Sequence, residues 1–409
     1  MFKVALIGVS GFGVTHYNDL MRYSRLGKLQ IVAATIINQD EEIEKCAALR
    51  AMNCRLYTDY QKMFDDFQGK LDLCFIPVGI ALHAPMAIAA MRSGASAMIE
   101  KPAAATIQEV NAMQEVEKAT GRFTAVGFQS IYQPEIQRIK REILAGKIGK
   151  IRSIKGLGLW PRDSQYYSRN SWAGKLRNNS WILDSPFNNA LAHYLNLLCF
   201  FAGKTFEESA EINSVKAGLF RCNPEIETTD CAAISLECKA GFDILFFTAH
   251  CSENHFGPEL TISGDKGSII WSPQRTIFEY SDHREEIPST SDAESIRNNM
   301  MDALLDRLIN PDAFICGLDI AGTHVLAVNG SHESAQIIPI PSDMVKKLTL
   351  DNNSYRYIWQ GMDELFHKLY AEERLPNASD CPMKIGEKFF MDNYQNFDGG
   401  KISVQRREL

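Results

Sequence analysis

The sequence predicts an α/β protein in which a doubly wound parallel sheet is followed by an α+β domain with a large, open, mostly antiparallel sheet. Three observations support this prediction. Strand-like and helical segments alternate through residues 2–127, a glycine-rich turn follows the first strand, and short strand-like segments separated by turns recur from residue 149 onward. The first pattern is typical of parallel sheets and the last of antiparallel ones.

The chain has 409 residues, which is enough for two domains that each bury a core. A net charge of -7 and the absence of a basic block argue against a nucleic-acid partner, so we expect a small-molecule substrate. The longest apolar stretch, residues 191–202, contains His193 and Asn196 and is too short to cross a bilayer. No membrane partner is therefore expected.

The ten cysteines are scattered singly, and the chain opens directly on a strand rather than on a secretory signal. We therefore expect reduced thiols and a cytoplasmic protein. His250, His255 and His283 lack carboxylates or thiols at the spacing of metal ligands, so no metal site is expected.

Residues 97–102, Ala-Met-Ile-Glu-Lys-Pro, organise the amino-terminal half, because this apolar run ends in an acid, a base and a proline. Ligands of open α/β sheets bind beyond the carboxyl ends of such strands. Lys101 is therefore expected at the mouth of a crevice, where Pro102 ends the strand. The competing interpretation is a solvated lysine at a strand end.

The first strand, Phe2–Ile7, runs into the turn Gly8-Val-Ser-Gly-Phe-Gly13 and then into a helical segment that continues through Leu26. Such a turn lets backbone N–H groups and the helix amino terminus approach a pyrophosphate. Ser10 takes the middle position of the dinucleotide fingerprint Gly-x-Gly-x-x-Gly. Similar motifs also occur as plain tight turns, but the place of this one after the first strand favours a dinucleotide site.

The second strand, Leu29–Ile36, is expected to end in an acid that binds the adenosine ribose of NAD. Ile36 stands at that position, and no arginine that would hold a 2′-phosphate follows directly. The sequence therefore leaves NAD and NADP open as the cofactor.

The alternation continues through a further set of predicted elements: helix 41–51, a short strand near 56–57, helix 60–67, strand 71–77, a helix opened by His83 that ends at 93–94, strand 97–102, helix 107–120 and strand 123–127. This spacing predicts a Rossmann-type dinucleotide-binding domain over residues 1–127.

Several motifs in order resemble one family. The glycine turn, the strand that ends at Pro77 with His83 after it, and the tripeptide Glu100-Lys101-Pro102 are similar to those of the Gfo/Idh/MocA oxidoreductases, the relatives of glucose-fructose oxidoreductase and inositol dehydrogenase. Residues 126–129 and 146–153 and the helix that carries His193 extend the resemblance over residues 1–340.

The resemblance implies that Lys101 lies beside the nicotinamide ribose and that the Lys101–Pro102 peptide is cis. It also implies that a defined set of residues binds NAD or NADP: Gly8, Ser10, Gly11, Phe12, Gly13, Pro77, His83, Glu100, Lys101 and Pro102.

Residues 187–198 are predicted to form a buried helix on which Asn189 and His193 share a face, because they are four residues apart. The resemblance implies Asp-x-x-x-His at this spacing, with the histidine facing the substrate and the acid supporting it. Asn189 replaces that acid and cannot stabilise an imidazolium by charge. We therefore expect either a less basic His193 or proton transfer by Lys101 alone. Without the resemblance, a lone histidine on an apolar helix would be interpreted as structural.

The segment 160–181 is rich in Arg, Asn, Ser, Tyr and Trp, and we expect it either to bind substrate or to form an ordinary surface excursion. The rest of the second half predicts strands at 149–158, 212–218, 231–238, 242–251, 259–262, 268–271 and 276–280, and helices at 132–145, 296–308 and 319–334. The resemblance implies that this sheet packs on helices and presents its other face to a partner subunit, in a homodimer or homotetramer.

These elements predict a substrate-binding and oligomerisation domain over residues 128–350. Residues 351–409 form an extension, which ends in a basic tail with Arg406 and Arg407 and is expected to brace the second domain or a partner subunit. One more amphipathic helix is predicted there from the helical spacing of Tyr355, Ile358, Met362, Leu365, Phe366 and Leu369.

Together these features predict an NAD(P)-dependent dehydrogenase that transfers a hydride between nicotinamide and a secondary hydroxyl of a sugar, cyclitol or related polyol. Lys101 is the first candidate base and His193 the second, with Asn189 orienting the histidine or the substrate. Two alternatives are a glycoside hydrolase that works by transient oxidation and elimination, and a non-catalytic nucleotide- or sugar-binding regulator. The departures at Ser10, Ile36 and Asn189 favour the regulator, whereas the retention of Lys101 and His193 argues against it.

Overall fold

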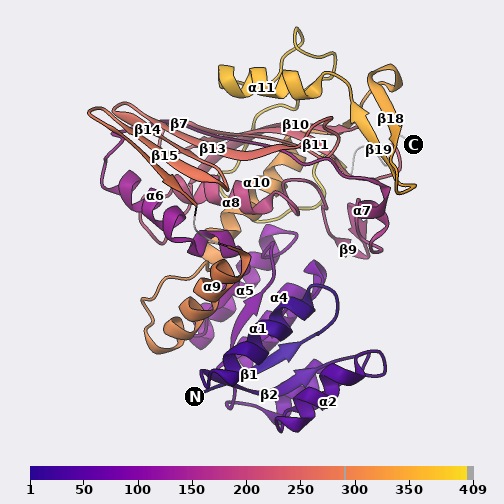
Figure 1. The fold of residues 1–409 in the computed structure, drawn as a ribbon, viewed down its shortest axis with the longest axis vertical. Coiled ribbons are helices and arrows are strands. Elements are labelled where there is room, and N and C mark those ends of the chain that lie inside the picture. Colours follow the sequence, from indigo (N-terminus) through magenta and orange to yellow (C-terminus); the bar gives the residue numbers. More distant parts are fainter. Residues whose placement is uncertain (290–291, 403–409) are drawn as a thin grey trace. The chain divides into compact units, whose positions relative to one another are not determined.

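The computed structural model describes residues 1–289 and 292–402, which form two compact units (Figure 1). The first unit comprises Met1–Gln133 and Ser291–Gly322, and the second comprises Pro134–Thr290 and Thr323–Leu409. The basic tail with Arg406 and Arg407 lies outside the described residues.

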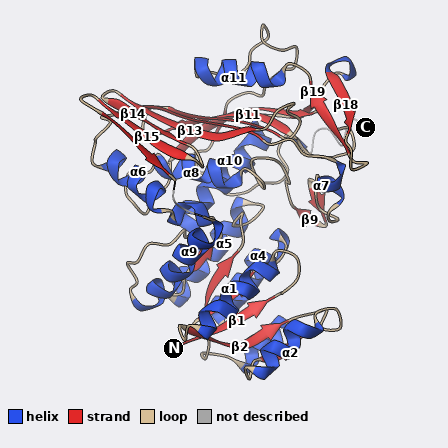
Figure 2. Cartoon of the chain, viewed as in Figure 1, coloured by secondary structure: helices blue, strands red, loops and turns tan. Residues whose placement is uncertain are grey.

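The first unit is built on a six-stranded parallel sheet of order β3-β2-β1-β4-β5-β6. Figure 2 shows β1 and β2 of this sheet in red, with helices of the same unit in blue. Its strands are β1 (Phe2–Ile7), β2 (Leu29–Thr35), β3 (Arg55–Tyr57), β4 (Leu73–Ile76), β5 (Ser96–Ile99) and β6 (Thr124–Val126). The connecting helices are α1 (Gly13–Arg25), α2 (Ile43–Ala51), α3 (Tyr60–Asp66), α4 (His83–Arg92) and α5 (Ile107–Thr120). The strand order turns back at β1, as it does in doubly wound sheets, so the predicted fold of this half is confirmed.

Residues 291–322 belong to the first unit, whereas the sequence-based division placed them in the second domain. Helix α9 (Ala293–Ile309) packs on α1, where the Arg297 guanidinium lies 2.5 Å from the Asp19 carboxylate. The backbone N–H of Cys316 donates to the Tyr132 hydroxyl at 2.8 Å. Contacts between residues so far apart in the chain leave no local signal in the sequence.

The second unit is built on a ten-stranded sheet of order β16-β15-β14-β13-β7-β12-β11-β10-β17, in which β20 also pairs with β10. Neighbouring strands are antiparallel except for the pairs β7–β12 and β10–β17, which confirms the predicted mostly antiparallel sheet. Its strands are β7 (Ile151–Leu159), β10 (Ile212–Arg221), β11 (Cys231–Cys238), β12 (Asp243–Ala249), β13 (Phe256–Gly264), β14 (Gly267–Trp271), β15 (Arg275–Tyr280), β16 (Arg284–Pro288), β17 (Ile337–Pro339) and β20 (Phe389–Phe390).

Helices cover both faces of this sheet. Helices α6 (Pro134–Leu144) and α8 (Ala192–Phe201) and most of α10 (Leu318–Ser334) lie on one face, and α11 (Met362–Glu372) lies on the other (Figure 1). The remaining elements are α7 (Ser164–Ser168) and two hairpins, β8 (Arg177–Asn178) with β9 (Ser180–Trp181) and β18 (Val345–Thr349) with β19 (Tyr355–Trp359).

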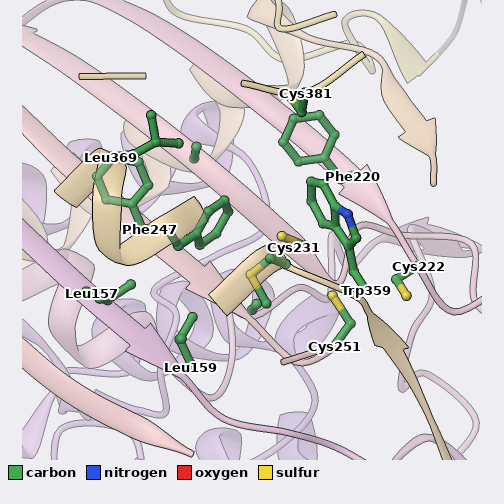
Figure 3. Close-up of a cluster of buried hydrophobic side chains, with 14 of the residues drawn as sticks. Leu157, Leu159, Phe220, Cys222, Cys231, Phe247, Cys251, Trp359, Leu369 and Cys381 are labelled. Carbon is green, nitrogen blue, oxygen red and sulfur yellow. The ribbon is translucent and has the colours of Figure 1, made fainter. Parts of the chain in front are cut away.

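The carboxyl-terminal residues therefore bury part of the sheet face that was expected to meet a partner. The ring of Trp359 lies 5.4 Å from that of Phe220, and both are labelled in Figure 3. The ring of Phe366 lies 5.5 Å from that of Phe247. These side chains belong to one buried hydrophobic cluster on β7, β10, β11 and β12.

The amphipathic helix predicted from Tyr355 is wrong in its first part. Residues 355–359, Tyr-Arg-Tyr-Ile-Trp, form strand β19, and the helix begins only at Met362, after Gly361 with a φ of 77°. Aromatic and β-branched residues favour strands, and here pairing with β18 overrides the helical spacing. None of the helices in residues 1–289 and 292–402 combines the length and apolar character that crossing a bilayer requires.

His332 of α10 is a buried titratable group in the second unit. Its side chain is fully buried, and its two ring nitrogens find no hydrogen-bond partner among the described residues. Burial lowers the pKa of His332 from 6.5 to about 4.

Acid is expected to destabilise the second unit through His332. The unfolded chain takes up this proton near pH 6.5 and the folded chain only near pH 4, so the contribution is complete above pH 6.5 and is lost as pH falls. His332→Leu removes this loss, so the variant should gain about 3 kcal/mol relative to the parent between pH 6.5 and pH 4. Urea titrations followed by tryptophan emission measure it, since all five tryptophans lie in the second unit.

The control is His283→Leu, because His283 is exposed. Burial raises the pKa of Asp230 to about 6, which acts in the opposite direction, but Asp230 is present in parent and variant alike and cancels in the comparison. Parallel pH curves for His332→Leu and the parent would contradict the prediction.

Candidate active site

The glycine turn of the first unit has the backbone form that a pyrophosphate site needs. Gly8 and Gly11 have φ values of 89° and 55°, in the left-handed region that favours glycine. A Cβ on Gly13 would lie 2.9 Å from the Gly8 carbonyl oxygen, so a side chain there would force the turn open. Helix α1 begins at Gly13, directly after the glycine turn, and has no acid in its first helical turn. The positive end of the helix dipole therefore faces the glycine turn and is not neutralised by a side chain of that helical turn. These residues fit the pyrophosphate of NAD.

Three of the predicted segments meet at one edge of the parallel sheet. The glycine turn follows β1, Pro77 follows β4, and Glu100 to Pro102 follow β5; these three strands are neighbours in the sheet. The Pro77 carbonyl oxygen lies 3.9 Å from the position of a Cβ on Gly8. The Lys101–Pro102 peptide is cis, as the resemblance implied.

His83 links the loops that follow β4 and β5. Its Nδ1 lies 2.9 Å from the Pro102 carbonyl oxygen and its Nε2 3.1 Å from the Val78 carbonyl oxygen. Burial lowers the pKa of His83, although the two carbonyls oppose the shift. His83 is 1% exposed, so its ring holds the two loops together and does not face solvent. Its predicted contact with a cofactor stays a prediction.

Glu100 is held by a residue that sequence reasoning missed, His16 of α1. The Nε2 of His16 lies 2.6 Å from Glu100 Oε1, and both side chains are buried. Burial raises the pKa of Glu100, but the hydrogen bond from His16 and the charges of His16, Lys101 and Arg297 outweigh it and leave the pKa below its ordinary value. The other oxygen, Oε2, accepts from the backbone N–H of Lys101 at 3.2 Å. Glu100 therefore joins α1 to the backbone of the candidate base.

Gly127→Ala is expected to disturb this arrangement. A Cβ on Gly127 would lie 2.9 Å from Glu100 Oε1, and that carboxylate cannot move without leaving His16. We expect the variant to lose about 1 to 3 kcal/mol of stability, measured by chemical unfolding that is monitored in the first unit by hydrogen exchange. Gly317→Ala is the control, because nothing lies within 4 Å of its added Cβ. Equal stability of the two variants would contradict the prediction.

In the second unit, Asn189 lies in the turn before α8 and not on the helix. Helix α8 begins at Ala192, so His193 occupies its first turn. The expectation that Asn189 and His193 share a helix face is therefore wrong. The Leu191 N–H donates to the Pro186 carbonyl five residues back, which interrupts the i→i−4 pattern just before α8 begins.

The Asp184 carboxylate lies beside Asn189, the residue that stands where the resemblance implies an acid. Its Nδ2 donates to Asp184 Oδ1 at 2.8 Å, and the backbone N–H of Gly174 donates to Asp184 Oδ2 at 2.7 Å. Asp184 is 5% exposed. The sequence offered no spacing signal for this pair, because Asp184 and Asn189 are joined through a turn and not through a helix.

The segment 160–181 is ordered by aromatic and arginine side chains. The hydroxyl of Tyr166 lies 3.5 Å from Asn189 Nδ2, and the guanidinium groups of Arg169 and Arg162 lie 3.6 Å and 4.7 Å from the centre of its ring. The indole N–H of Trp160 donates to the Gly257 carbonyl at 3.1 Å. The segment thus approaches Asn189, and a substrate-binding role for it stays a prediction.

The structure brings the predicted site residues together in two groups, and each group lies within its own unit. Glycine-turn residues, Pro77, His83 and Glu100 to Pro102 belong to the first unit, whereas Asn189 and His193 belong to the second. No group of three or more His, Cys, Asp or Glu side chains in the part of the chain that the structure describes is placed to hold a metal ion.

A doubly wound sheet with a glycine turn after β1, joined to a mostly antiparallel sheet, is typical of a two-domain nucleotide-binding protein. Comparison with known families places the chain within this class. The oxidoreductase family with an NAD-binding Rossmann fold matches residues 2–128, and the GFO/IDH/MocA C-terminal domain matches residues 136–270. The chain therefore belongs to the GFO/IDH/MocA family, which confirms the resemblance, the enzyme class and NAD as a cofactor.

Individual relatives are distant. The chain is 23% identical over 256 residues to 4-carboxy-2-hydroxymuconate-6-semialdehyde dehydrogenase of Sphingobium, covering 63% of this chain and 73% of the relative. It is 27% identical over 154 residues to scyllo-inositol 2-dehydrogenase (NAD(+)) of Bacillus subtilis, covering 38% of this chain and 43% of that protein, and 24% identical over 249 residues to inositol 2-dehydrogenase of Azotobacter vinelandii, covering 58% and 69%.

Solved structures share the fold. The WlbA dehydrogenase of Bordetella pertussis, in complex with NADH and UDP-GlcNAcA, has a TM-score of 0.64 at 19% identity and covers 80% of this chain and 94% of its own. A levoglucosan dehydrogenase in complex with NADH and L-sorbose has a TM-score of 0.67 at 17% identity, covering 81% and 95%.

Proposed function

We propose that the chain is an NAD-dependent dehydrogenase that oxidises a secondary hydroxyl of a sugar, cyclitol or related polyol. The observation that carries the proposal is the place of Lys101, which follows β5 at the sheet edge of the glycine turn and whose backbone is held by buried Glu100. The relatives support the substrate class, since two are inositol dehydrogenases and one structural neighbour is a levoglucosan dehydrogenase.

Oxidation of a secondary alcohol removes a hydride from carbon and a proton from the hydroxyl oxygen. Bound NAD supplies the hydride acceptor. In this proposal the neutral amine of Lys101 takes the hydroxyl proton, and His193 is the second candidate for that role. Asn189, whose amide is oriented by Asp184, orients His193 or the substrate.

The test combines the purified chain with NAD and a panel of inositols, levoglucosan, free hexoses and a nucleotide-linked uronic acid. The expected result is NADH formation, read at the nicotinamide absorbance, with one class of polyol. Cleavage of a glycoside without net NADH would support the hydrolase alternative. NAD binding without turnover of any member would favour the non-catalytic alternative.

The proposal includes a homo-oligomer, as the resemblance implied. Because α11 covers the sheet over β7 and β12, a second copy would use the strands beyond them. The mass of the purified chain, measured by light scattering, tests this part. The cytoplasmic location expected from the scattered cysteines stays a prediction.

A further inference from the structure

The end of β2 lacks the acid that binds the adenosine ribose, but a carboxylate reaches the same place from further along the chain. β2 ends at Thr35, Ile36 is 1% exposed, and Ile37 points to solvent at 83% exposed. The chain then turns through residues 38–42 into α2. Ser10 Oγ, in the middle of the glycine turn, donates to Glu42 Oε1 at 2.7 Å.

Asn38, in the same loop, also bonds to the Ser10 hydroxyl. Asn38 Nδ2 lies 3.1 Å from Ser10 Oγ and 2.8 Å from Glu41 Oε2, so the loop after β2 is joined to the glycine turn through Ser10. The backbone N–H of Gly8 also donates to the Thr35 carbonyl at 2.9 Å. The turn and the end of β2 therefore form one surface.

The position of the Glu42 carboxylate is the one that ribose recognition requires. The adenosine ribose is bonded directly to the pyrophosphate, so a group that accepts from its hydroxyls must lie beside the turn that binds the pyrophosphate. Glu42 touches that turn at Ser10, the residue at the middle fingerprint position. Hydrogen bonds from Lys45 and Ser10 lower the pKa of Glu42, so its carboxylate is ionised at neutral pH and acts as an acceptor.

The loop is negatively charged, which disfavours binding of the 2′-phosphate of NADP. Residues 40–45 carry four acids, Asp40, Glu41, Glu42 and Glu44, against one lysine, which gives a net charge of -3. That lysine, Lys45, is paired with Glu42 Oε2. A phosphate dianion placed beside Glu42 would therefore meet like charge.

We propose that Glu42 is the acid that binds the adenosine ribose hydroxyls in this chain and that it selects NAD over NADP, with the Ser10 hydroxyl, which Asn38 also contacts, holding its carboxylate at the glycine turn. This inference rests on NAD binding by the first unit and not on the proposed oxidation of a polyol. Its test therefore measures binding without any polyol.

The experiment titrates NADH and NADPH into the full chain and follows nicotinamide fluorescence. The parent should bind NADH at least 10-fold more tightly than NADPH. A hydrogen bond to a charged group is worth roughly 10- to 100-fold in affinity, so E42Q should weaken NADH by that factor and leave NADPH unchanged or tighter. The matched control is E44Q, which removes the same charge from an exposed residue of the same helix start and should change either affinity less than about 3-fold.

A second measurement changes the ligand as well as the residue. By the same fluorescence, the parent should bind NADH that lacks the adenosine 2′-hydroxyl at least 10-fold more weakly than NADH, and E42Q should bind the two alike. Equal affinity of the parent for both would overturn the proposal, as would an unchanged NADH affinity in E42Q or tighter binding of NADPH by the parent. Loss of NADPH binding in K45M, with NADH unaffected, would assign the loop to 2′-phosphate binding and also overturn it.

Discussion

Lys101→Met is expected to lower turnover of the polyol identified by the panel about 1000-fold, within the range that a positioned general base contributes. Methionine keeps an unbranched apolar side chain that reaches as far as the Cε position and removes the amine that takes the hydroxyl proton. The backbone of residue 101 still donates to Glu100, so the strand end and the glycine turn should keep their form. The measurement is the initial rate of NADH formation at saturating substrate.

NADH binding and thermal stability of Lys101→Met should stay close to those of the parent, which separates loss of chemistry from loss of the site. Lys118→Met is the matched control, because Lys118 is exposed on α5 of the same unit. A variant at Lys101 that kept full turnover would assign the base elsewhere, with His193 the next residue to replace.

Phe366→Ala is expected to destabilise the second unit by about 3 to 5 kcal/mol, as is usual when a buried phenylalanine is truncated. The side chain of Phe366 is fully buried between Phe247 of the sheet and Trp359 of β19. Its loss leaves a cavity under α11, in the cluster that Figure 3 shows. Urea unfolding followed by tryptophan emission measures the change in the second unit alone.

Phe390→Ala is the control for this truncation, because Phe390 is 61% exposed and its removal leaves no cavity. A loss below about 1 kcal/mol in Phe366→Ala would mean that α11 does not contribute to the core. The mass of this variant in solution also reports whether the face under α11 associates with a second copy once the helix is loosened.

Much of the fold could be predicted because local sequence patterns specify its strands and helices. The parallel strands β4 and β5 are buried along their whole length and appear as short apolar runs between turn residues. Strand ends that carry Pro77 and Glu100-Lys101-Pro102 could be placed from the rule that parallel strands share a carboxyl edge. The helix prediction for residues 355–359 is wrong because Tyr355 and Ile358 fit a helical spacing, while Tyr355, Tyr357 and Trp359 alternate as in a strand, and only pairing with β18 decides between the two.

The candidate site was only partly predictable, because its supporting groups come from distant or irregular segments. His16 supports Glu100 across 84 residues, and Glu42 reaches Ser10 across 32. Neither contact follows a helical or strand period. Asp184 reaches Asn189 through a turn whose shape no short motif specifies.

The sequence by itself determined the two domain classes, the nucleotide-binding edge and the identity of Lys101 as the leading candidate base, because each depends on residue types at short and regular spacing. Only the tertiary structure decided which carboxylates lie at that edge, since the hydrogen bonds of Glu100 and Glu42, at 2.6 and 2.7 Å, require atoms from separate elements to meet. It also decided that residues 291–322 join the first unit and that α11 covers the second sheet, because burial of a distant apolar or charged surface leaves no local trace in the chain.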